Sequence, residues 1–455
     1  MYVKNATELI DNGKTQADRE ARRVCLGAVE AALKAVEPAR LIKSKLSIAG
    51  SRLIVDDSRF DLAKFRRILV IGGGKAAGPM AKSLESIMGR WITAGMVSVP
   101  ESSGPKSSNT RIKFHPASHP LPGRSGVEGV GKMLGLVGTP TRDDLVICLT
   151  SGGGSSLLPL PIEGIALTDK VKVTRGLMLA GATIQELNVV RKHLSSLKGG
   201  RLAERLYPAT VLSLVISDVV GDRLDSIASG PLYPDTSTYH DAIEILKRFN
   251  LWKGAPTSVV SMLTKGARGR VPETPKPGSR CFEKVTNIVL GSNDDAANAA
   301  VRYLRWRGTR PVLLSTSLEG EARFMGMSFG SVLGFSGTKQ RPCSFVIGGE
   351  TTVTVVGRGR GGRNQEFALG AALKMDGNQG VAMVALGTDG RDGPTDAAGA
   401  VVDGHTIRRG RSRRLSAEDI LRRNDTYRFF GGLRDLVVTG PTGTNVNDLA
   451  VGAVV

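Results

Sequence analysis

Continuous apolar runs, each followed by small and polar residues, recur along the chain. The runs cover residues 67–71, 145–149, 211–216, 287–290 and 381–386, and Gly together with Ser, Thr, Asp or Lys follows each of them. Buried parallel strands have this continuous apolar pattern because helices cover both faces of their sheet. Open α/β sheets bind ligands beyond the carboxyl ends of their strands. The pattern therefore predicts an α/β protein whose chemistry lies in the segments that follow these runs.

The first run belongs to a strand–loop–helix–strand succession. After 67–71 come a glycine loop, a helix-like segment over 79–88 and a second strand-like run over 94–99. Such a succession is typical of parallel α/β units, in which a helix connects neighbouring strands.

A helix is expected near the start of the chain, over residues 15–37. Thr15 and Asp18 have the spacing of a capping box, and Pro38 ends the helical periodicity.

A Pro- and Gly-rich stretch with little apolar periodicity covers residues 253–283. We interpret it as a linker between an N-terminal α/β domain over 1–252 and a C-terminal α/β domain over 284–455. Each domain is expected to hold a mainly parallel sheet flanked by helices, and the first to be Rossmann-like.

Composition and charge narrow the class of protein. With 41% hydrophobic and 23% charged residues among 455, the chain is globular and neither disordered nor fibrous. Its 62 Lys and Arg against 42 Asp and Glu give a formal charge of +20, which suggests an anionic partner such as nucleic acid, a membrane or a phosphorylated metabolite. Aromatic residues make up only 5%, which disfavours a stacking platform for nucleic acid.

Cysteine usage and hydropathy predict a cytoplasmic protein. The four cysteines lie far apart and form no C-x-x-C pair, which excludes a zinc ribbon and a dithiol motif and fits a reducing compartment. No apolar run approaches the roughly 18 residues that a membrane span needs, and we see no secretory signal.

The glycine loop after the first run allows more than one interpretation. Gly72, Gly74 and Ala77 fit the G-x-G-x-x-A form of the dinucleotide fingerprint, and Glu101 ends the next strand, where an acid that binds the ribose belongs. Lys75 adds a cation to the backbone N–H groups of a helix start, which favours phosphate or carboxylate binding. A structural turn with a solvated lysine fits the same residues.

Later loops carry candidate chemistry as well. Thr150–Ser156 is a glycine triplet flanked by hydroxyls, which can wrap phosphates through main-chain N–H groups. Asp218 follows the run 211–216 and can act as a base or a Mg²⁺ ligand. Arg363 follows a glycine-rich stretch and leads into a helix, where it can clamp an anion with two hydrogen bonds. Each segment also has a plain structural interpretation as a turn, a cap or solvated surface.

The densest polar loop covers residues 387–396. Its carboxylates Asp389, Asp392 and Asp396 can bind Mg²⁺ or deprotonate a hydroxyl, and an acidic turn is the plain alternative. The five histidines have no metal-binding spacing, and the chain contains neither a Walker A motif nor a G-x-S-x-G nucleophile elbow.

Taken in their order along the chain, these segments resemble the type II glycerate kinase family, whose C-terminal half is called the MOFRL domain. The resemblance covers residues 20–455, and a match of this length is far more specific than any single motif. It rests on the stretches Ile71–Gly78, His119–Pro122, Leu149–Ser155, Asn188–Ser195, Ile216–Asp222, Ser229–Pro231, Gly348–Thr351, Gly361–Phe367, Gly387–Gly390, Gly393–Gly399 and Thr439–Asp448.

The resemblance implies a two-domain kinase that phosphorylates D-glycerate with ATP and Mg²⁺, mostly at C2, with a MOFRL region over about 341–450. The sequence leaves the number of subunits open, with a homodimer as one candidate, and we expect neither nucleic acid nor a membrane as partner. The family's catalytic residues fall on Lys75, Arg363, Asp389 and Asp218, of which Asp218 and Asp389 are the expected metal ligands. The residues expected to contact ATP and substrate are Gly73, Gly74, Ser151, Gly152, Gly153, Ser155, Asn364, Glu366 and Thr388.

The chain departs from the family pattern in two places. Gly123 stands where many relatives have an acid after His-Pro-x-Pro, at the expected rim of the substrate site. The second departure is an arginine-rich stretch, which we interpret as solvated surface or subunit contact without a catalytic role. It contains Arg408, Arg409, Arg411, Arg413, Arg414, Arg422 and Arg423.

Two other functions stay open as alternatives. An NAD(P)H-dependent hydroxypyruvate reductase would use the dinucleotide fingerprint, but the sequence offers no clear His–carboxylate pair for hydride chemistry. A nucleic-acid binder would use the charge of +20 and the Gly-Arg run over 357–363. The low aromatic content and the kinase-like loops oppose the second alternative.

Overall fold

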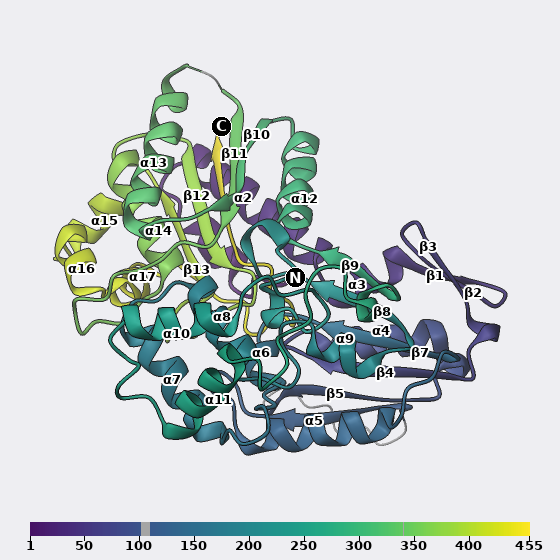
Figure 1. Cartoon of the computed structure of the whole chain (residues 1–455). Helices are drawn as coiled ribbons and strands as arrows, with labels where there is room; N and C mark the ends of the chain where they lie inside the picture. The colour runs from purple at the N-terminus through teal and green to yellow at the C-terminus, as the bar shows by residue number, and fades with distance from the viewer. Residues whose placement is uncertain (102–109, 340) are drawn as a thin grey trace. The chain divides into compact units, whose positions relative to one another are not determined.

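The chain is divided between two units, and its first residues belong with its last ones (Figure 1). The computed structural model describes residues 1–101, 110–339 and 341–455. One unit comprises Leu41–Leu290, and we call it the parallel-sheet unit. The other, the mixed-sheet unit, combines Met1–Arg40 with Gly291–Val455.

The parallel-sheet unit is organised by six strands. They lie in the order β6 (Ile112–Ala117), β5 (Ala94–Pro100), β4 (Arg67–Gly73), β7 (Asp144–Thr150), β8 (Thr210–Ile216) and β9 (Val285–Gly291). Every pairing from β6 to β8 is parallel. Numbered along the chain, this is the order 3-2-1-4-5-6 of a Rossmann-type sheet, whose topological switch point lies between β4 and β7. The predicted Rossmann-like fold is confirmed.

Helices α4 (Ala77–Met88), α5 (Arg124–Val137) and α9 (Arg201–Leu206) pack on this sheet. Four further helices pack on one another in a core cluster of their own: α7 (Leu167–Leu179), α8 (Ile184–His193), α10 (Tyr239–Arg248) and α11 (Thr257–Ala267). Helix α3 (Pro38–Lys45) leads into the unit, and α6 (Gly154–Leu157) follows β7. A small antiparallel sheet of β1 (Leu46–Ala49), β2 (Arg52–Val55) and β3 (Ser58–Asp61) precedes β4. Leu69, Val146 and Val211, from three neighbouring strands, pack in one core cluster. Each such side chain contributes about 1.5–3 kcal/mol when fully buried.

The mixed-sheet unit has a second six-stranded sheet. Its strands lie in the order β10 (Arg310–Leu318), β11 (Cys343–Gly349), β15 (Asp448–Val454), β12 (Val381–Gly387), β13 (Gly399–Asp403) and β14 (Leu436–Val437). Its helices are α1 (Ala6–Asp11), α2 (Gln16–Ala35), α12 (Asn293–Trp306), α13 (Ala322–Lys339), α14 (Arg363–Met375), α15 (Thr406–Ser412), α16 (Ala417–Arg423) and α17 (Thr426–Leu433).

The expectation of a mainly parallel sheet is wrong for this unit. Only β10 and β11 pair in parallel, and the other pairings are antiparallel. The reason is visible in β12, which is buried at every position. Met383 and Ala385 belong to the core cluster of α13 and α14, while α2 packs on the strand as well. A strand covered on both faces has a continuous apolar sequence whatever its direction.

The units also differ from the predicted succession of domains. Helix α2, which begins at the predicted Thr15–Asp18 capping box, packs on β12 and β15 and lies among these strands in Figure 1. Strand β9 is an edge of the first sheet and does not open the second. The expected linker over 253–283 contains α11, whose Val259 and Leu263 are buried, so this stretch is part of the parallel-sheet unit.

A buried ion network joins the first helices to the end of the chain. The Arg22 guanidinium, which is 0% exposed, donates from Nε to Asp403 Oδ2 at 2.7 Å and from Nη1 to Asp435 Oδ1 at 2.9 Å. Arg409 Nη2 lies 2.6 Å from the other Asp435 oxygen. Burial would raise the pKa of Asp403, but Arg22 and Arg409 outweigh it and hold that pKa below its ordinary value. Because buried charges persist only when paired, the network ties α2 to the mixed-sheet unit.

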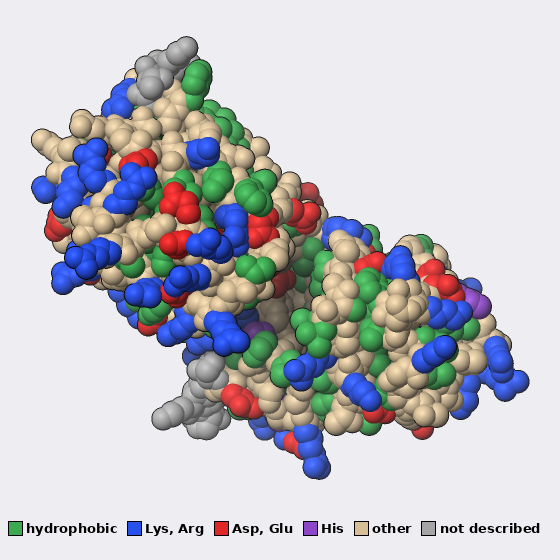
Figure 2. Space-filling model, turned by 90° about the vertical axis from the view of Figure 1, so that its left-hand side faces the viewer, with side chains coloured by type: hydrophobic (Ala, Val, Ile, Leu, Met, Phe, Trp, Pro, Cys, Tyr) green, Lys and Arg blue, Asp and Glu red, His purple; other side chains and the backbone are tan. Residues whose placement is uncertain are grey.

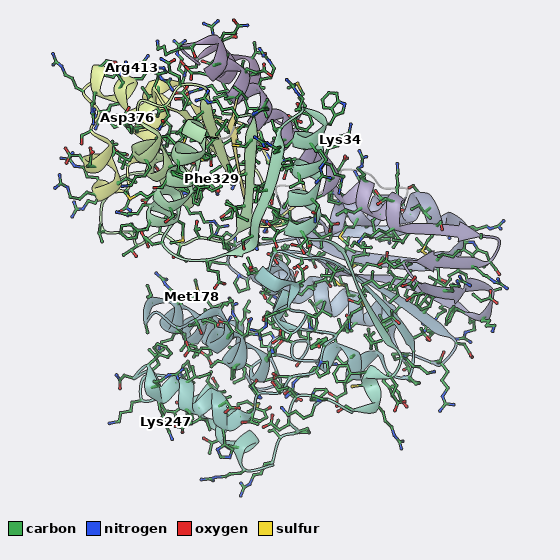
Figure 3. All side chains as sticks on the ribbon, turned by 90° about the horizontal axis from the view of Figure 1, so that it is seen from above. Lys34, Met178, Lys247, Phe329, Asp376 and Arg413 are labelled. Carbon is green, nitrogen blue, oxygen red and sulfur yellow. The ribbon has the colours of Figure 1, made fainter. Side chains whose placement is uncertain are left out.

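Helices α13 and α14 pack closely and position the start of α14. A Cβ on Gly326 would lie 2.0 Å from the carbonyl oxygen of Phe367, so only glycine allows this approach. The rings of Phe329 and Phe367 continue the contact with their centroids 5.8 Å apart. Figure 3 shows Phe329 inside the unit and Arg413 on its outside.

Charge is dispersed over the surface. On the face shown in Figure 2, Lys and Arg side chains are spread out, with Asp and Glu among them. Arg409 is the exception within the arginine-rich segment, because its side chain is 10% exposed and bound to Asp435. Among the described residues, no helix has the length and apolar character needed to cross a membrane.

Replacing Arg22 should destabilise the protein strongly. Arg22→Met leaves Asp403 and Asp435 short of a partner in a dry interior, and breaking such a buried pair costs about 3–5 kcal/mol. Arg23→Met is the matched control, since the Arg23 side chain is 49% exposed, and its expected effect is within about 0.5 kcal/mol. Denaturant unfolding followed by circular dichroism measures both. Equal losses in the two variants would contradict the network's role.

Candidate active site

The loops that follow β4 and β7 meet at the switch point. Gly72 and Gly74 have φ values of 141° and 152°, and a Cβ on Gly74 would lie 2.1 Å from Ser151 Oγ. The N–H of Lys75 donates to the carbonyl of Gly152 at 2.8 Å, and the N–H of Ala76 donates to Ser151 Oγ at 3.0 Å. Each loop therefore holds the other in place through main-chain contacts that a larger residue at position 74 would prevent.

Lys75 lies beside the second loop. A Cβ on Gly153 would come within 3.3 Å of Lys75 Cγ and 3.0 Å of His119 Nε2, so the two side chains flank this glycine. His119 was not predicted as a site residue, although the stretch His119–Pro122 is one of those that carry the resemblance to the family. Lys75, Gly73, Gly74 and the loop over 151–155 thus form one group at the carboxyl ends of β4 and β7, where Rossmann-type sheets bind ligands.

The same geometry weakens the dinucleotide interpretation. A pyrophosphate at this turn needs free N–H groups, but those of Lys75 and Ala76 already donate to the loop after β7. Glu101, the expected ribose ligand, accepts a hydrogen bond from the Ser118 hydroxyl at 3.1 Å.

Hydroxyls continue this group toward the end of β8. Ser155 Oγ lies 3.0 Å from Ser229 Oγ, and the Ser229 hydroxyl donates to Asn188 Oδ1 at 2.9 Å. Asp218 is half-buried two residues after β8. Ser151, by contrast, is 1% exposed, and its hydroxyl oxygen accepts the hydrogen bond from the N–H of Ala76.

Arg363 is the centre of a second group, in the mixed-sheet unit. It opens α14 and donates from Nη1 to Glu350 Oε1 at 2.6 Å, while its Nε lies 2.6 Å from Asp448 Oδ2. Burial would lower the pKa of Arg363, but Asp448 and Glu350 outweigh it and hold that pKa above its ordinary value. The arginine is thus a permanent cation held by two carboxylates, neither of which was predicted as a site residue.

A further carboxylate caps the same helix. Asp392 Oδ1 accepts the N–H of Asn364 at 3.0 Å, and Asp392 Oδ2 accepts the N–H of Gln365 at 2.9 Å. Carboxylates are favoured at a helix N-terminus, where N–H groups lack partners. Asn364 also donates from Nδ2 to Asp448 Oδ1 at 3.0 Å, which links the cap to the Arg363 group.

The loop after β12 borders this group. Asp389 is half-buried and accepts the N–H of Arg391 at 3.0 Å. A Cβ on Gly387 would lie 3.5 Å from Asp389 Oδ1 and 3.6 Å from Asn364 Nδ2, so both side chains adjoin that glycine. Asp389 therefore belongs to the Arg363 group.

Two predicted contact residues have their polar atoms engaged within the unit. Thr388 is 1% exposed, donates to the carbonyl of Asn447 at 2.7 Å and accepts the N–H of Val446 at 2.8 Å. Glu366, also 1% exposed, accepts from Asn424 Nδ2 at 2.7 Å and lies 2.9 Å from Arg323 Nη2. Both side chains support the loops around the site.

The described residues contain no group of three or more His, Cys, Asp or Glu that could hold a metal ion by itself. Mg²⁺ does not require such a group, because it commonly uses one or two carboxylates together with phosphates and waters. Asp218 and Asp389 each offer one half-buried carboxylate, and a single carboxylate of this kind fits an ion that arrives with a nucleotide.

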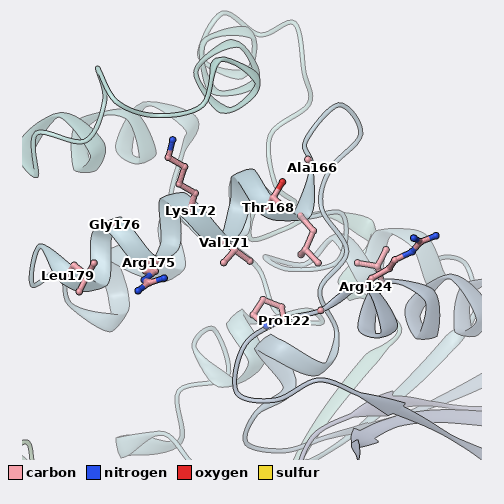
Figure 4. A pocket seen from close by; sticks show the side chains of 12 residues that line it. Pro122, Arg124, Ala166, Thr168, Val171, Lys172, Arg175, Gly176 and Leu179 are labelled. Carbon is pink, nitrogen blue, oxygen red and sulfur yellow. The ribbon is translucent and has the colours of Figure 1, made fainter.

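A pocket of about 890 Å³ lies elsewhere in the parallel-sheet unit, between the start of α5 and α7 (Figure 4). Gly123, expected at the substrate rim, is part of its wall. Lys172, Arg175 and Arg124 point in different directions in Figure 4. Ligand sites need polar groups that converge, and apart from Gly123 none of the described lining residues is among the predicted site residues. Lys75 at a strand end and Arg363 at a helix start lie outside this pocket. Basic residues in such positions are typical of enzymes that act on anionic substrates.

Comparison with known proteins identifies the family. Residues 24–264 match the family described as "Domain of unknown function (DUF4147)", and residues 343–448 match the MOFRL family. The D-glycerate 2-kinase of Thermotoga maritima is 39% identical over 440 residues, which cover 95% of this chain and 98% of that protein. A crystal structure of glycerate kinase from the same organism has a TM-score of 0.82 at 38% identity, covering 95% of this chain and 99% of that one. The chain belongs to the glycerate kinase family.

Some relatives have a different name. A protein of Agrobacterium vitis is 41% identical over 392 residues, which cover 84% of this chain and 98% of that protein, and it is provisionally named a hydroxypyruvate reductase.

The stability of the mixed-sheet unit should depend on the protonation of Asp448. Burial raises the pKa of Asp448 to about 7, although Arg363 and Asn364 act in the opposite direction. From about pH 4 to about pH 7 the native protein keeps this proton while the unfolded chain releases it, so the free energy of unfolding falls as pH rises. Asp448→Asn removes this contribution, and its unfolding free energy should fall less over that range than that of the unmodified protein. Denaturant titrations across the range measure both slopes, and identical slopes would contradict the assignment.

Proposed function

We propose that the protein transfers the terminal phosphoryl group of ATP to D-glycerate, at C2, giving 2-phosphoglycerate. The observation that carries this proposal is the match to a D-glycerate 2-kinase over 95% of the chain. Two features of the structure support it: Lys75 stands at the switch point of a Rossmann-type sheet, and Arg363 is held at the start of α14.

Phosphoryl transfer depends on positioning and on neutralising charge more than on covalent chemistry. In the proposed mechanism Lys75 and Arg363 offset the negative charge of the transferring group. The main-chain N–H groups of Gly152 and Gly153 are the proposed cradle for ATP phosphates. Gly73 and Gly74 shape the adjacent turn, since the N–H of Gly74 already donates to the carbonyl of Ser98 at 3.2 Å. Ser155 and Asn364 are proposed to lie beside the substrates. Asp389 orients or deprotonates the attacking hydroxyl.

Mg²⁺ is the proposed cofactor, with Asp218 and Asp389 as its protein ligands. When bound, such an ion neutralises phosphate charge. We also propose a cytoplasmic location, since all four cysteines are free thiols and three of them are buried.

The activity is tested directly with ATP, Mg²⁺ and D-glycerate. Phosphorus NMR of the product distinguishes phosphate on C2 from phosphate on C3. A 2-phosphoglycerate signal that grows with time and requires both substrates is expected, and a 3-phosphoglycerate signal would correct the position.

Removing either cation should lower turnover. Lys75→Met and Arg363→Gln are each expected to reduce kcat by about 100- to 1,000-fold, the effect of losing one group that stabilises charge in a transition state. The matched controls Lys82→Met and Arg358→Gln alter exposed residues of α4 and of the loop before α14. Near-normal kcat in both test variants, with all four proteins folded, would overturn the proposed roles.

A hydroxypyruvate reductase is the second candidate, favoured by the name of the Agrobacterium relative and by the fingerprint at Gly72, Gly74 and Ala77. We expect no steady oxidation of NADH or NADPH with hydroxypyruvate, because the N–H groups of the fingerprint turn are already engaged. Absorbance of the reduced nicotinamide follows the reaction. Steady oxidation at an enzymatic rate would favour the reductase.

A further inference from the structure

Three basic side chains and one amide lie next to the loops of β7 and β8; Arg191 is half-buried and the others are buried. Lys170 comes from α7, Asn188 and Arg191 from α8, and Lys198 from the segment after α8. Lys170 is 6% exposed, and Asn188 and Lys198 are 3% exposed. Asn188 and Arg191 are three residues apart on one helix, which places them on the same face.

Hydrogen bonds and close contacts join this group to the candidate active site of the parallel-sheet unit. Lys198 Nζ donates to the carbonyl of Ala228 at 3.0 Å. Ala228 borders Gly154 of the β7 loop, and its neighbour Ser229 bridges Asn188 and Ser155. Ala228 and Ser229 have φ values of 50° and 62°, a conformation that L residues rarely adopt. Such backbone strain persists where the surrounding structure imposes it, often at ligand sites.

The cations of this group lack acidic partners. Among the described residues, Lys170 Nζ and Asn188 Nδ2 are buried without any hydrogen-bond acceptor, and no carboxylate forms an ion pair with Lys170, Arg191 or Lys198. The neighbouring Lys192 shows the ordinary arrangement, with its Nζ 3.2 Å from Asp235 Oδ1.

Such an arrangement is costly unless a ligand completes it. Burial lowers the pKa of Lys170 to about 7, and Arg191 lowers it further by repulsion. Burial also lowers the pKa of Lys198 well below its ordinary value, with Lys170 and Arg191 adding to the effect. An arriving anion would offset both the repulsion and the loss of hydration.

We propose that Lys170, Asn188, Arg191 and Lys198 form the subsite for the carboxylate of the acceptor, a small hydroxy acid; taken as D-glycerate, this inference rests on the proposed function. The guanidinium of an arginine can donate two parallel hydrogen bonds to the two oxygens of a carboxylate. The free amide N–H group of Asn188 and the Ser155 hydroxyl stand ready for the acceptor's own hydroxyls. Side-chain cations and an amide suit a carboxylate, whereas nucleotide phosphates are better matched by main-chain N–H groups of glycine loops.

Calorimetric titration of the full chain with D-glycerate and, separately, with ATP tests the subsite. Arg191→Gln should weaken D-glycerate binding by at least about tenfold, about 1.4 kcal/mol, and leave ATP binding within about twofold. Arg191→Lys should recover part of the loss. Arg270→Gln is the matched control, an exposed arginine of the same unit. Unchanged D-glycerate affinity in Arg191→Gln, or an equal or larger loss for ATP, would overturn the proposal.

Thermal unfolding separates binding from a structural role. Because Lys170 has no partner, Lys170→Met should not lower the Tm of the ligand-free protein, yet it should abolish the rise in Tm that D-glycerate causes. A lower Tm without ligand together with an unchanged response to D-glycerate would mark Lys170 as structural.

Proton uptake gives an independent readout. At a pH one unit above the pKa of about 7 that burial gives Lys170, a bound carboxylate should draw a proton onto the group that Lys170, Arg191 and Lys198 form. Titrations in two buffers of different ionisation enthalpy should show this uptake for the unmodified protein and a smaller one for Lys170→Met. Binding without uptake would contradict contact between the carboxylate and Lys170.

The subsite and the proposed activity fail in distinguishable ways. If D-glycerate or glycolate binds in an Arg191-dependent manner but no phosphoglycerate forms with ATP, the kinase proposal fails and the subsite stands. If phosphoglycerate forms while binding is independent of Arg191, the subsite fails and the kinase proposal stands. Absence of binding by both acids in the unmodified protein would overturn the subsite.

Discussion

Close main-chain contact between the loops after β4 and β7 is the constraint on which the parallel-sheet site depends. Ser151 occupies the space that a side chain at position 74 would need, and it accepts the N–H of Ala76. The lysine between these two positions therefore has its backbone fixed from both sides. Because the contact lies at the switch point of the sheet, it sets the position of Lys75 and of the hydroxyl-lined loop at once.

Some basic side chains in the interior have acidic partners, and others have none among the described residues. Arg22 is held by two carboxylates, so its charge is balanced within the protein. Lys170 and Lys198 are buried and Arg191 is half-buried, and none of the three has such a partner among the described residues. Balanced pairs hold a fold together, whereas unbalanced ones carry a free-energy cost that a ligand of opposite charge can relieve. This contrast distinguishes the structural arginine Arg22 from the basic residues to which we assign binding.

Local patterns in the sequence predicted local structure well. The sequence predicted the capping box at Thr15 and Asp18, the glycine loops and strands β4, β5, β7 and β8, because each depends on neighbouring residues, whereas β6 was not predicted. The direction of the strands around β12 could not be predicted from the sequence, because burial on both faces removes the alternation of polar and apolar residues. The assignment of β9 to the first sheet was hidden because pairing with β8 leaves no mark in either strand.

The charged partners of the site were the other part that sequence could not supply. Asp448 lies 85 residues from Arg363, and Asp403 lies 381 residues from Arg22. No spacing rule connects such residues, and only the fold brings them together. Asp392 was weighed as a metal ligand or base, and its position at the start of α14 gives it a capping role that depends on a helix 28 residues earlier.

The sharing of the mixed-sheet unit between the two ends of the chain affects its synthesis. Helix α2 leaves the ribosome early, whereas β12 and β15, on which it packs, are made near the end. The apolar face of α2 and the charge of Arg22 therefore lack these packing and ion-pair partners while the residues between them are being synthesised. Contacts between residues this far apart in the sequence slow folding and prolong the exposure of apolar surface that can aggregate. The nascent protein should accordingly depend on chaperones to shield its first helices until the last strand has been added.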